Sequence, residues 1–574
     1  MMGTISDKLM RIINTKEDIR QALISKGYDV PTSIPFKEYA KMISDLPCRV
    51  DSFPDIEGIV ARYSALGLTN EQMAENPVWK DLTDNGHDLQ MKNLAWKGMS
   101  GVGGYVGDFS KWVNNRDTTE IGITKSNSKV IIDVKVSQGS GKNIVFISKS
   151  NLGISNNVTI KITSTYPEGV MKFANSASNK YLKLPSNGII TLQDNPEYTS
   201  NEMHLHLASA DLGQITIEQL PLYPGALVFD GVDDYGVCEN FPILTKEKGY
   251  TVVTLRQYLA ESIGYLVYNG TNAKQSAFAF ERSDSLDTWS WGKNSSIRNS
   301  LPKLMSYQTS NSYNNNIIST GTAIEGDKLI RIASSGGYCN VAIWELVFLD
   351  HDATEEELTK IKNYFVKTYP WLFPDQAWTV VGKTNEDEDR ATIANITGNG
   401  NDLVLYNLGF AEGSGYNEEG EYAGYLVTDG VDDRVVSRSF TLNKDWTIVG
   451  NWKMLQPEAN KSSGIVKQNS LFIYNHVDGL NISINDAWIF FKLKDIRSVN
   501  AICSDGRIYL NDWTEIIDSK QQTVNESVGA LVIGILGNVY TSLAFKNLGI
   551  YNNQLLSKDD CIKAYNYLQT LKSK

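Results

Sequence analysis

The chain has 574 residues, of which 41% are hydrophobic, and its formal net charge at pH 7 is −12. This length and apolar content suffice for three or four folded domains. The acidic balance argues against nucleic acid as a partner, because phosphate binding depends on clustered Lys and Arg. The longest apolar run, at 528–537, spans about ten residues against the roughly twenty of a membrane-spanning helix, so no membrane insertion is expected.

The start of the chain, Met1–Lys8, lacks the apolar stretch of a secretory signal peptide, and we expect no classical export signal. Five scattered cysteines include no Cys-x-x-Cys pair, which favours buried free thiols made in a reducing cytosol.

Residues 1–50 are predicted to form a small helical module. Thr15–Asp18 has the pattern of a helix start and Gly27 that of a helix end, and a second helix is predicted from Pro35 to Leu46. Two helices this short are not stable alone. They therefore either pack on the next domain or dock on a partner through their apolar faces, which carry Ile19 and Leu23 in the first helix and Phe36, Tyr39 and Ile43 in the second.

The rest of the chain contains one structural unit twice, which decides its domain organisation. Three elements recur in the same order: Asp81–Leu89 as Asn395–Leu403, Asp230-Gly-Val-Asp-Asp234 as Asp429-Gly-Val-Asp-Asp433, and Glu345–Leu349 as Asn547–Tyr551. A helix-start signal follows the last element in each copy, at Thr354–Glu357 and at Ser557–Asp560.

The spacing of these elements predicts an inserted domain in the first copy. From Leu89 to Asp230 is 141 residues, whereas from Leu403 to Asp429 is 26. The difference of 115 residues is enough for a domain placed in a surface loop, where insertions are tolerated. The insert has the pattern of a small β-sandwich, because short β-branched runs alternate with turn residues at 129–136, 143–148, 158–162 and 188–192.

The repeated units are also predicted to be β-rich. Runs at 226–229 and 425–427 lead into Asp-Gly turns, and Trp446–Trp452 alternates large and small side chains like a half-buried strand. A closing helix in the second copy places Ile562, Tyr565 and Leu568 on one face. The sequence thus predicts a mainly β protein with four parts: a helical module at 1–50, a discontinuous first β domain at 51–111 and 223–373, an inserted β-sandwich at 112–222, and a second β domain at 374–574.

The repeated Asp-Gly-Val-Asp-Asp phrase allows two interpretations. As a turn, its Asp side chains bond their own backbone while Gly supplies a positive φ, and this is the interpretation that the sequence favours. The alternative is a site for Ca²⁺, which takes six to eight oxygen ligands, but the sequence does not identify enough further carboxylates to complete the shell. The residues concerned are Asp230, Asp233, Asp234, Asp429, Asp432 and Asp433.

Other chemical motifs are weak. His204 and His206 share one face of a predicted strand, but no third zinc ligand is visible. Gly139–Asn143 lacks the spacing of a phosphate-binding loop and is typical of a hairpin turn. No pair of carboxylates at glycosidase spacing occurs, and the acidic run Glu386–Asp389 is typical of a solvated loop. We therefore expect no enzyme activity, no metal requirement and no cofactor.

Part of the N-terminal module resembles a known kind of segment. Thr15–Leu23, Gly27–Val30 and Phe36–Ile43 resemble the N-terminal segment shared by fibre and appendage proteins of crAss-like and related phages of gut bacteria. The resemblance covers about 35 residues and implies attachment to a virion, with Ile19, Leu23, Phe36, Tyr39 and Ile43 as docking residues; it also suggests a homotrimer.

The two repeated units resemble laminin-G-like, concanavalin-type jelly rolls. Leu227–Tyr235 carries that family's Leu-x-Phe-Asp-Gly-x-Asp-Asp-Tyr pattern, whereas the second copy has Thr428 in place of Phe and Arg434 in place of Tyr. The fold class expected is therefore mainly β, with two such jelly-roll sandwiches, a small inserted β-sandwich and a short helical anchor.

These observations predict a structural virion protein made in the host bacterial cytoplasm, a head or tail fibre subunit. It would dock on other phage proteins through residues 1–50 and present lectin-like β domains to host surface glycans. Two alternatives stay open. One is a polysaccharide depolymerase on a jelly-roll fold, and the other is a ligand-free capsid decoration protein.

Overall fold

The protein is mainly β, with several antiparallel sheets and few helices, as predicted. The computed structural model describes Lys16, Arg20 and most of residues 53–573; within 53–573 the longest segments left out are 149–157, 193–202, 318–326 and 518–526. The chain divides into two compact units, one of residues 1–55 with 359–368 and one of residues 56–358 with 369–574.

Most of the predicted N-terminal module, including all five proposed docking residues, lies outside the described residues. Lys16 and Arg20, both within the first predicted helix, have helical backbone. In the same compact unit, the ring of Phe53 lies edge-on to that of Tyr364, with ring centroids 4.9 Å apart. This contact joins the start of the continuously described chain to the helix at 355–368.

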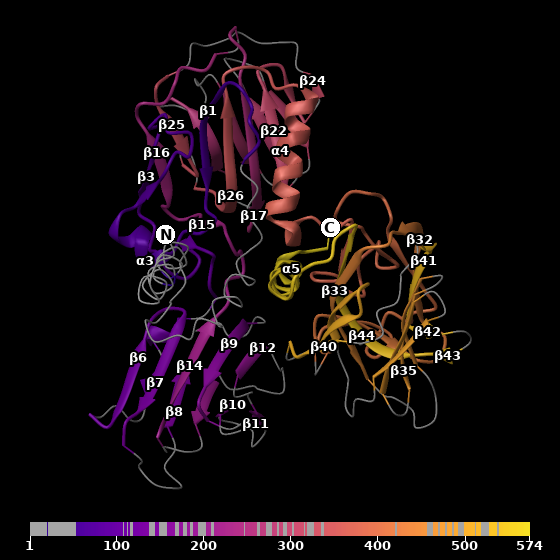
Figure 1. The fold of residues 1–574 in the computed structure, drawn as a ribbon. Helices are drawn as coiled ribbons and strands as arrows, with labels where there is room; N and C mark the ends of the chain where they lie inside the picture. The colour runs from indigo at the N-terminus through magenta and orange to yellow at the C-terminus, as the bar shows by residue number, and fades with distance from the viewer. Residues whose placement is uncertain are drawn as a thin grey trace, which may run out of the picture. The chain divides into compact units, whose positions relative to one another are not determined.

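The first jelly roll consists of two sheets, each of eight strands in the described part of the chain. One sheet has the order β24 (Asn316–Ile317), β23 (Ser312–Tyr313), β22 (Met305–Thr309), β17 (Thr251–Tyr258), β26 (Asn340–Leu349), β15 (Leu227–Asp230) and β4 (Gly101–Val102), with β1 (Ile59–Ser64) also paired to β26. The other has the order β2 (Val78–Trp79), β3 (Leu89–Lys92), β16 (Tyr235–Cys238), β25 (Ile330–Ile332), β18 (Gly264–Asn269), β19 (Ala279–Ser283), β20 (Leu286–Ser290) and β21 (Ser296–Ser300). Segments far apart in the sequence thus lie side by side, as indigo β1 and pink β26 do in Figure 1.

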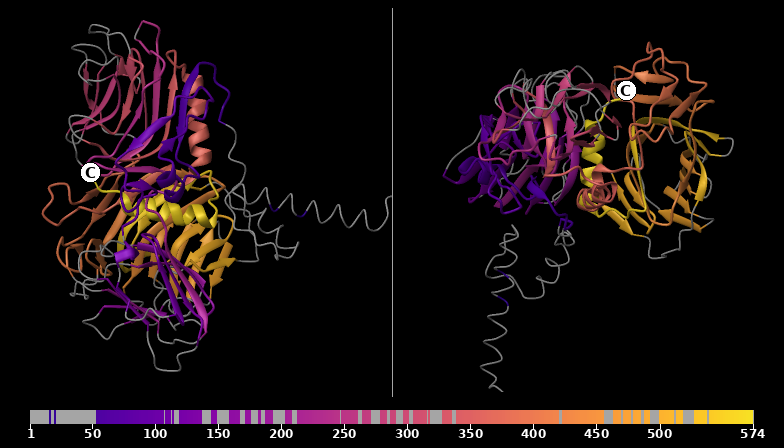
Figure 2. Two further views of the ribbon diagram at one scale, coloured as in Figure 1. Left: turned by 90° about the vertical axis from the view of Figure 1, so that its left-hand side faces the viewer. Right: turned by 90° about the horizontal axis from the view of Figure 1, so that it is seen from above.

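The second jelly roll has the same strand order in both of its sheets, although its first sheet is given below from the opposite edge. Its first sheet runs β30 (Gly415–Asn417), β31 (Tyr425–Asp429), β44 (Ser542–Asn552), β33 (Trp446–Met454), β38 (Val499–Cys503), β39 (Arg507–Leu510) and β40 (Glu515–Ile517), with β27 (Gln376–Thr379) also paired to β44. Its second sheet runs β28 (Thr392–Ile393), β29 (Leu403–Tyr406), β32 (Arg434–Leu442), β41 (Ser527–Ile533), β34 (Ser463–Gln468), β35 (Leu471–His476), β36 (Gly479–Ile484) and β37 (Ala487–Phe491). A small hairpin, β42 (Ile535–Leu536) and β43 (Val539–Tyr540), follows β41. The two layers are visible in Figure 2.

Each jelly roll closes around its own apolar core, which side chains from both sheets fill. In the first, Leu227 and Phe229 from one sheet join Leu266 and Ile332 from the other, all fully buried. The second core is built in the same way, with Leu426, Ile448, Leu403 and Leu531 among its members. Alternating burial along the shorter strands, such as buried–exposed–buried–exposed in β3 and β29, follows from the two-residue period of a strand.

The inserted segment forms two sheets, and its strands pair only with other strands of the insert in the described part of the chain. Their orders are β11 (Tyr181–Lys183), β10 (Met171–Asn175), β13 (Met203–Leu207), β8 (Ile144–Ser148) and β5 (Val113–Asn114), and β12 (Asn187–Leu192), β9 (Val158–Ser164), β14 (Gly213–Gln219), β7 (Lys129–Val134) and β6 (Ile121–Lys125). The four strands predicted from β-branched runs are present as β7, β8, β9 and β12. The boundaries 112–222 stay a prediction.

The helices of the described residues are short or peripheral: α3 (Asn70–Glu75), η1 (Phe109–Lys111), α4 (Glu355–Thr368), η3 (Pro370–Leu372) and α5 (Lys558–Thr570). Both predicted helix starts are confirmed. The Thr354 backbone N–H donates to the Glu357 carboxylate at 2.8 Å, and the Asp560 backbone N–H donates to the Ser557 hydroxyl at 3.1 Å. In α4 the Glu357 N–H also donates to the Thr354 hydroxyl at 3.3 Å, which completes the reciprocal pair of a capping box.

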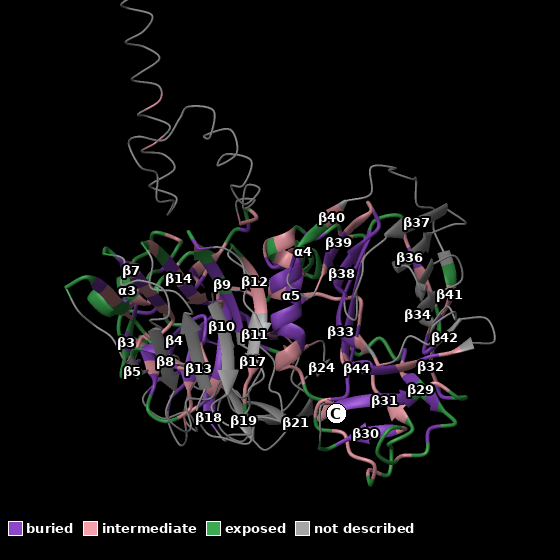
Figure 3. Cartoon of the chain, turned by 90° about the horizontal axis from the view of Figure 1, so that it is seen from below, coloured by how far each residue is buried: buried purple, intermediate pink, exposed green. Residues whose placement is uncertain are grey.

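Helix α5 packs on β33 and β44, and this corrects one prediction. The alternation of large and small side chains in Trp446–Trp452 predicts a half-buried strand, but every residue from 446 to 452 is buried. One face of the strand looks into the core and α5 covers the other (Figure 3). Ile562, Tyr565 and Leu568, which are predicted to share one face of this helix, are all buried. Gly549 in β44 permits this approach, since a Cβ there would lie 3.0 Å from a methyl group of Leu568.

The four described cysteines, Cys238, Cys339, Cys503 and Cys561, are buried and free, as predicted. None of the described helices is long and apolar enough to cross a membrane.

The geometry at the ends of the insert leads to a prediction. The Leu222 backbone N–H donates to the Gly104 carbonyl at 3.0 Å, and the Tyr223 N–H donates to the Gly103 carbonyl at 2.8 Å, so the chain returns beside the point where it left. Replacing residues 112–220 by a short Gly-Ser linker should therefore leave both jelly rolls folded, with Tm lower by only a few degrees in calorimetry. As a control, a fragment of residues 112–222 should fold alone by circular dichroism. Global unfolding of the deletion variant would show that the insert shares a core with its host.

Candidate functional site

The repeated phrase forms a tight turn at the same place in each jelly roll, and we call Asp230–Asp234 and Asp429–Asp433 the acidic turns. Each turn carries the chain from one sheet to the other, from β15 to β16 and from β31 to β32. Its first Asp side chain accepts the backbone N–H two residues on, at 2.8 Å from Val232 and 2.7 Å from Val431. This is the bonding of an Asx turn.

The glycines of the acidic turns have the positive φ that the turn interpretation requires, 78° at both Gly231 and Gly430. Neither glycine position has room for a Cβ atom. A Cβ at 430 would lie 2.9 Å from the backbone nitrogen of Ser542, and one at 231 would lie 3.0 Å from that of Asn340. Glycine is thus needed for both conformation and close approach.

The last aspartate of each acidic turn is buried inside the corner. Asp234 is 1% exposed and Asp433 is 0% exposed. One carboxylate oxygen, Oδ2, accepts the backbone N–H of the first turn residue, at 3.0 Å from Asp230 and 2.9 Å from Asp429. It ties the two ends of the turn together.

A second loop supports this carboxylate, and we call residues 93–101 and 407–415 the serine loops. The Ser414 hydroxyl donates to Oδ2 of Asp433 at 2.8 Å, and the Ser100 side chain hydrogen-bonds the Asp234 carboxylate. At the start of each loop an Asn side chain donates to a turn carbonyl, from Asn93 to residue 233 at 3.0 Å and from Asn407 to residue 432 at 3.1 Å.

The sequence motifs do not identify the serine loops, although a signal is present. The repeat matched at Asp81–Leu89 and Asn395–Leu403 continues with the same offset of 314 positions through Asn93 and Asn407 to Ser100 and Ser414. An aromatic residue recurs there too, as Trp96 and Phe410, with φ of 54° and 51°. Extending the alignment by about twelve residues would have paired each loop with its turn.

The other oxygen of each buried aspartate, Oδ1, has no hydrogen-bond partner among the described residues. Burial, together with the nearby charges of Asp230 and Asp233, raises the pKa of the Asp234 carboxyl to about 6. The pKa of Asp433 is raised for the same reasons, burial first and then the charges of its two neighbours in the turn. Burial and the neighbouring carboxylates therefore both disfavour the charged form of the Asp234 and Asp433 side chains.

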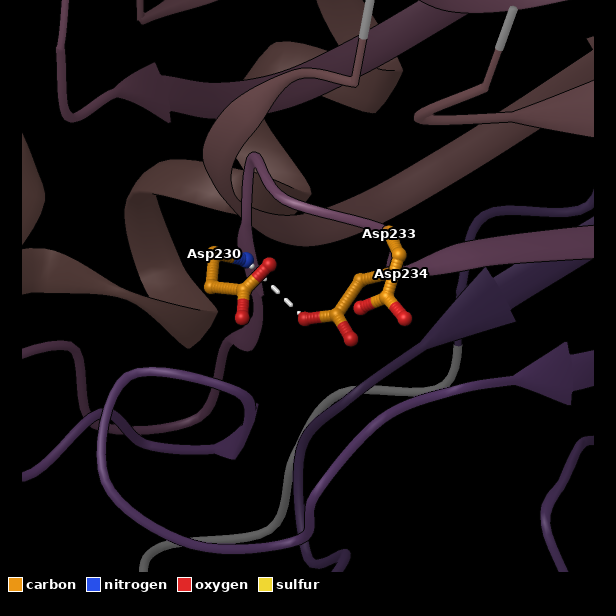
Figure 4. Close-up of side chains that lie close together, drawn as sticks. All are labelled: Asp230, Asp233 and Asp234. Carbon is orange, nitrogen blue, oxygen red and sulfur yellow. Dashed lines mark hydrogen bonds between the residues drawn. The ribbon is translucent and has the colours of Figure 1, made fainter.

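The three carboxylates of each turn converge. Each contributes an oxygen such that the three atoms lie within 4.8 Å of one another. Figure 4 shows Asp230, Asp233 and Asp234 pointing toward one another from the two sides of the turn. Asp233 is exposed and Asp230 half-buried, so the cluster reaches solvent on one side. These are the residues that could hold a metal ion.

The surface beside the acidic turns carries an aromatic ring and a cation in both copies, but in swapped positions. In the second copy, Tyr406 of β29 is paired with Arg434 of β32, whose guanidinium lies 5.0 Å from the ring centre. In the first copy the corresponding pair is Lys92 and Tyr235. The second copy thus has Arg434 where the first has Tyr235, and Tyr406 where the first has Lys92. The Tyr406 side chain is 42% exposed.

The tip of each acidic turn presents an apolar side chain to solvent. Val232 and Val431 are each 70% exposed, the largest exposed fractions among the large hydrophobic residues of the described chain. An exposed valine between carboxylates has no role in the core, so each tip offers a small apolar contact on an acidic surface.

The weaker sequence motifs gain no support as sites. His204 and His206 lie on β13, but the structure does not describe their side chains, and Gly139–Asn143 lies outside the described residues. In the acidic run Glu386–Asp389, Asp387 accepts the Thr384 N–H at 2.9 Å and Asp389 pairs with Lys383 at 2.5 Å. These bonds are those of a surface turn.

Comparison with known proteins shows distant structural likeness. No family model and no curated protein matches the chain. A Trypanosoma rangeli sialidase in complex with sialic acid is 10% identical, over 79% of this chain and 85% of that one, with a TM-score of 0.26. The botulinum neurotoxin serotype C1 binding domain is 9% identical over 58% and 91%, with a TM-score of 0.23. A truncated AlyQ with CBM32 and alginate lyase domains is 10% identical over 57% and 92%, with a TM-score of 0.19. TM-scores this low carry no functional argument.

A matched pair of glycines tests the acidic turn. Gly430→Ala should lower the free energy of unfolding of the second jelly roll by about 2–4 kcal/mol, through left-handed strain and the contact with Ser542. Gly424 has nearly the same φ, 76°, but nothing within 4 Å of an added Cβ, so Gly424→Ala should cost only about 1–2 kcal/mol. Urea unfolding measures both. Equal losses would mean that the close approach at Gly430 is unimportant.

The serine loop can be tested in the same domain. Ser414→Ala removes the hydroxyl donor to the buried carboxylate and should cost about 1–3 kcal/mol of unfolding free energy. Ser439→Ala, at an exposed position of β32, is the control and should change stability by less than about 0.5 kcal/mol. In a double-mutant cycle with Asp433→Asn, the Ser414 effect should shrink. Additive effects would argue against a direct coupling.

Proposed function

We propose that the chain is a non-enzymatic appendage subunit of a phage particle, a head or tail fibre protein. In this proposal residues 1–50 dock on other virion proteins, and the jelly rolls and the inserted sandwich contact host surface glycans. The observation that carries the proposal is the division of the chain into two compact units: residues 1–55 with 359–368 form one, and residues 56–358 with 369–574, which hold the strands of both jelly rolls, form the other.

The separate N-terminal unit supports a docking role. Its sequence resembles the virion-anchoring segment of phage appendage proteins, and its two predicted apolar faces are too short to form a core of their own. An anchor of this kind leaves the body free to carry recognition surfaces. By the same resemblance we propose a homotrimer as the assembled form.

The surface beside the acidic turns supports glycan contact. Sugar rings stack on aromatic faces and hydrogen-bond to amides and carboxylates. Tyr406 is 42% exposed, the neighbouring Asn407 side chain donates to the Asp432 carbonyl, and the Asp429 and Asp432 carboxylates lie in the same turn. Two copies of such a corner in one chain, and more in an oligomer, would raise the overall affinity of weak contacts through multivalency.

Truncation tests the anchor. A protein that begins at Phe53 keeps every described strand and should fold, but it should be missing from purified virions, as measured by immunoblotting of particles. A full-length protein carrying Leu23→Asp and Tyr39→Asp should fail in the same way, because charges on the apolar faces prevent docking. Normal incorporation of the truncated protein would overturn the proposed anchor.

Glycan binding tests the presenting surface. The full chain should bind host surface polysaccharide on an array, and Tyr406→Ala should weaken that binding at least roughly tenfold through loss of stacking. Leu555→Ala, 41% exposed and distant in sequence from the turns, is the control and should bind normally. Binding of no host glycan would favour a ligand-free decoration protein, and release of reducing sugar would favour a depolymerase.

A further inference from the structure

We propose that Cys503 and Cys561 form a disulfide when the protein meets a peroxide. This bond would fasten the C-terminal helix α5 to the first sheet of the second jelly roll. The sequence predicts free thiols, because its five cysteines are scattered and include no Cys-x-x-Cys pair. The fold brings these two together although they lie 58 positions apart in the chain.

The two cysteines come from elements that meet at strand β33. Cys503 is the last residue of β38, where it lies opposite Thr447 of β33. Cys561 lies near the start of α5, which packs on the same strand. Both cysteine residues are fully buried, so the pair is part of the contact between helix and sheet.

The contacts around Thr447 place both sulfur atoms against one short segment of chain. The Thr447 hydroxyl lies 3.7 Å from the Cys503 sulfur, and its oxygen accepts the Leu556 backbone N–H at 3.0 Å. The carbonyl of the same Leu556 lies 4.0 Å from the Cys561 sulfur. The Cys561 thiol hydrogen-bonds the Cys503 sulfur directly. The two sulfurs are therefore neighbours, with the helix on one side and the sheet on the other.

The surroundings of the pair make Cys503 the attacking sulfur, because the thiolate is the nucleophilic form of cysteine. The hydrogen bond from Cys561 lowers the pKa of the Cys503 thiol, and the charge of Arg507 lowers it further against the opposing effect of burial. Burial raises the pKa of Cys561, which therefore keeps its proton. A sulfur of thiolate character beside a second thiol is the arrangement in which oxidation ends in a disulfide.

Hydrogen peroxide supplies the whole oxidation. The Cys503 thiolate attacks one peroxide oxygen, the O–O bond breaks, and Cys503 becomes a sulfenic acid while the released hydroxide takes up a proton as water. The Cys561 sulfur then attacks the Cys503 sulfur, the S–O bond breaks, and the hydroxyl group leaves with the Cys561 proton as a second water. Two thiols and one peroxide give one disulfide and two waters. Peroxide is little larger than water and reaches a buried pair through local opening of the helix.

The disulfide would fix the element that ends the described chain. Terminal segments are among the first parts of a domain to open, and α5 covers one face of β33 and β44. A crosslink that closes a long loop restricts the unfolded chain and so stabilises the folded one. In a reducing cytosol the thiols stay free, whereas outside the cell oxidation would hold α5 on the sheet.

Peroxide treatment of the full chain tests the pair directly. At a peroxide concentration that oxidises free cysteine, non-reducing peptide mapping by mass spectrometry should find the peptide with Cys503 joined to the peptide with Cys561. Tm in calorimetry should rise by several degrees and should return to its starting value on addition of dithiothreitol. A map without this crosslink, whether the two sulfurs stay reduced or are oxidised separately, would overturn the proposal.

Variants show whether the crosslink causes the change in Tm. Cys503→Ala and Cys561→Ala should each abolish the crosslink and the rise in Tm. Cys238→Ala, at a buried free cysteine of the first jelly roll, is the matched control and should keep both. A rise in Tm on oxidation of either pair variant would place the effect elsewhere and count against the disulfide.

The rate of crosslinking tests the role of Cys503 as the attacking sulfur. Arg507→Gln removes the nearby positive charge and should slow crosslink formation several-fold at neutral pH. The slowing should shrink as pH rises, because Cys503 then loses its proton without help from Arg507. An equal rate in both proteins at neutral pH would contradict the assignment of Cys503.

Discussion

The buried carboxylate at the end of each acidic turn holds the corner on which the jelly rolls depend. Oδ2 of Asp234 bonds the backbone of Asp230 across the turn, and Oδ2 of Asp433 does the same for Asp429. Because the turn joins a strand of one sheet to a strand of the other, this bond fixes how the chain passes between the two layers. A serine from a neighbouring loop adds to the support, so that in the second copy two segments separated in the sequence, the acidic turn and the serine loop, meet at one oxygen atom.

The duplication shows which parts of the unit the fold requires and which are free to vary. The strand order, the turn glycines, the buried aspartates and the asparagine and serine of the support loop recur in both copies. The surface beside the corner differs, since Lys92 and Tyr235 in one copy become Tyr406 and Arg434 in the other. An aromatic–cation pair is kept while its members exchange strands, which is possible because cross-strand neighbours contact each other from either side. The surface next to the corner can therefore change between the two copies while the fold stays the same.

The sequence by itself determined the repeat, the four strands predicted in the insert, the starts of α4 and α5 and the positive φ of Gly231 and Gly430. These features depend on local patterns: side-chain period, turn chemistry and the spacing of two similar segments. Tertiary structure alone decided the rest. Trp446–Trp452 is buried on both faces because α5 folds back over it, and the unpaired Oδ1 of Asp234 arises where a turn, a loop and two sheets enclose a carboxylate. Burial of this kind depends on what segments distant in the sequence place around a residue, and no local pattern contains that information.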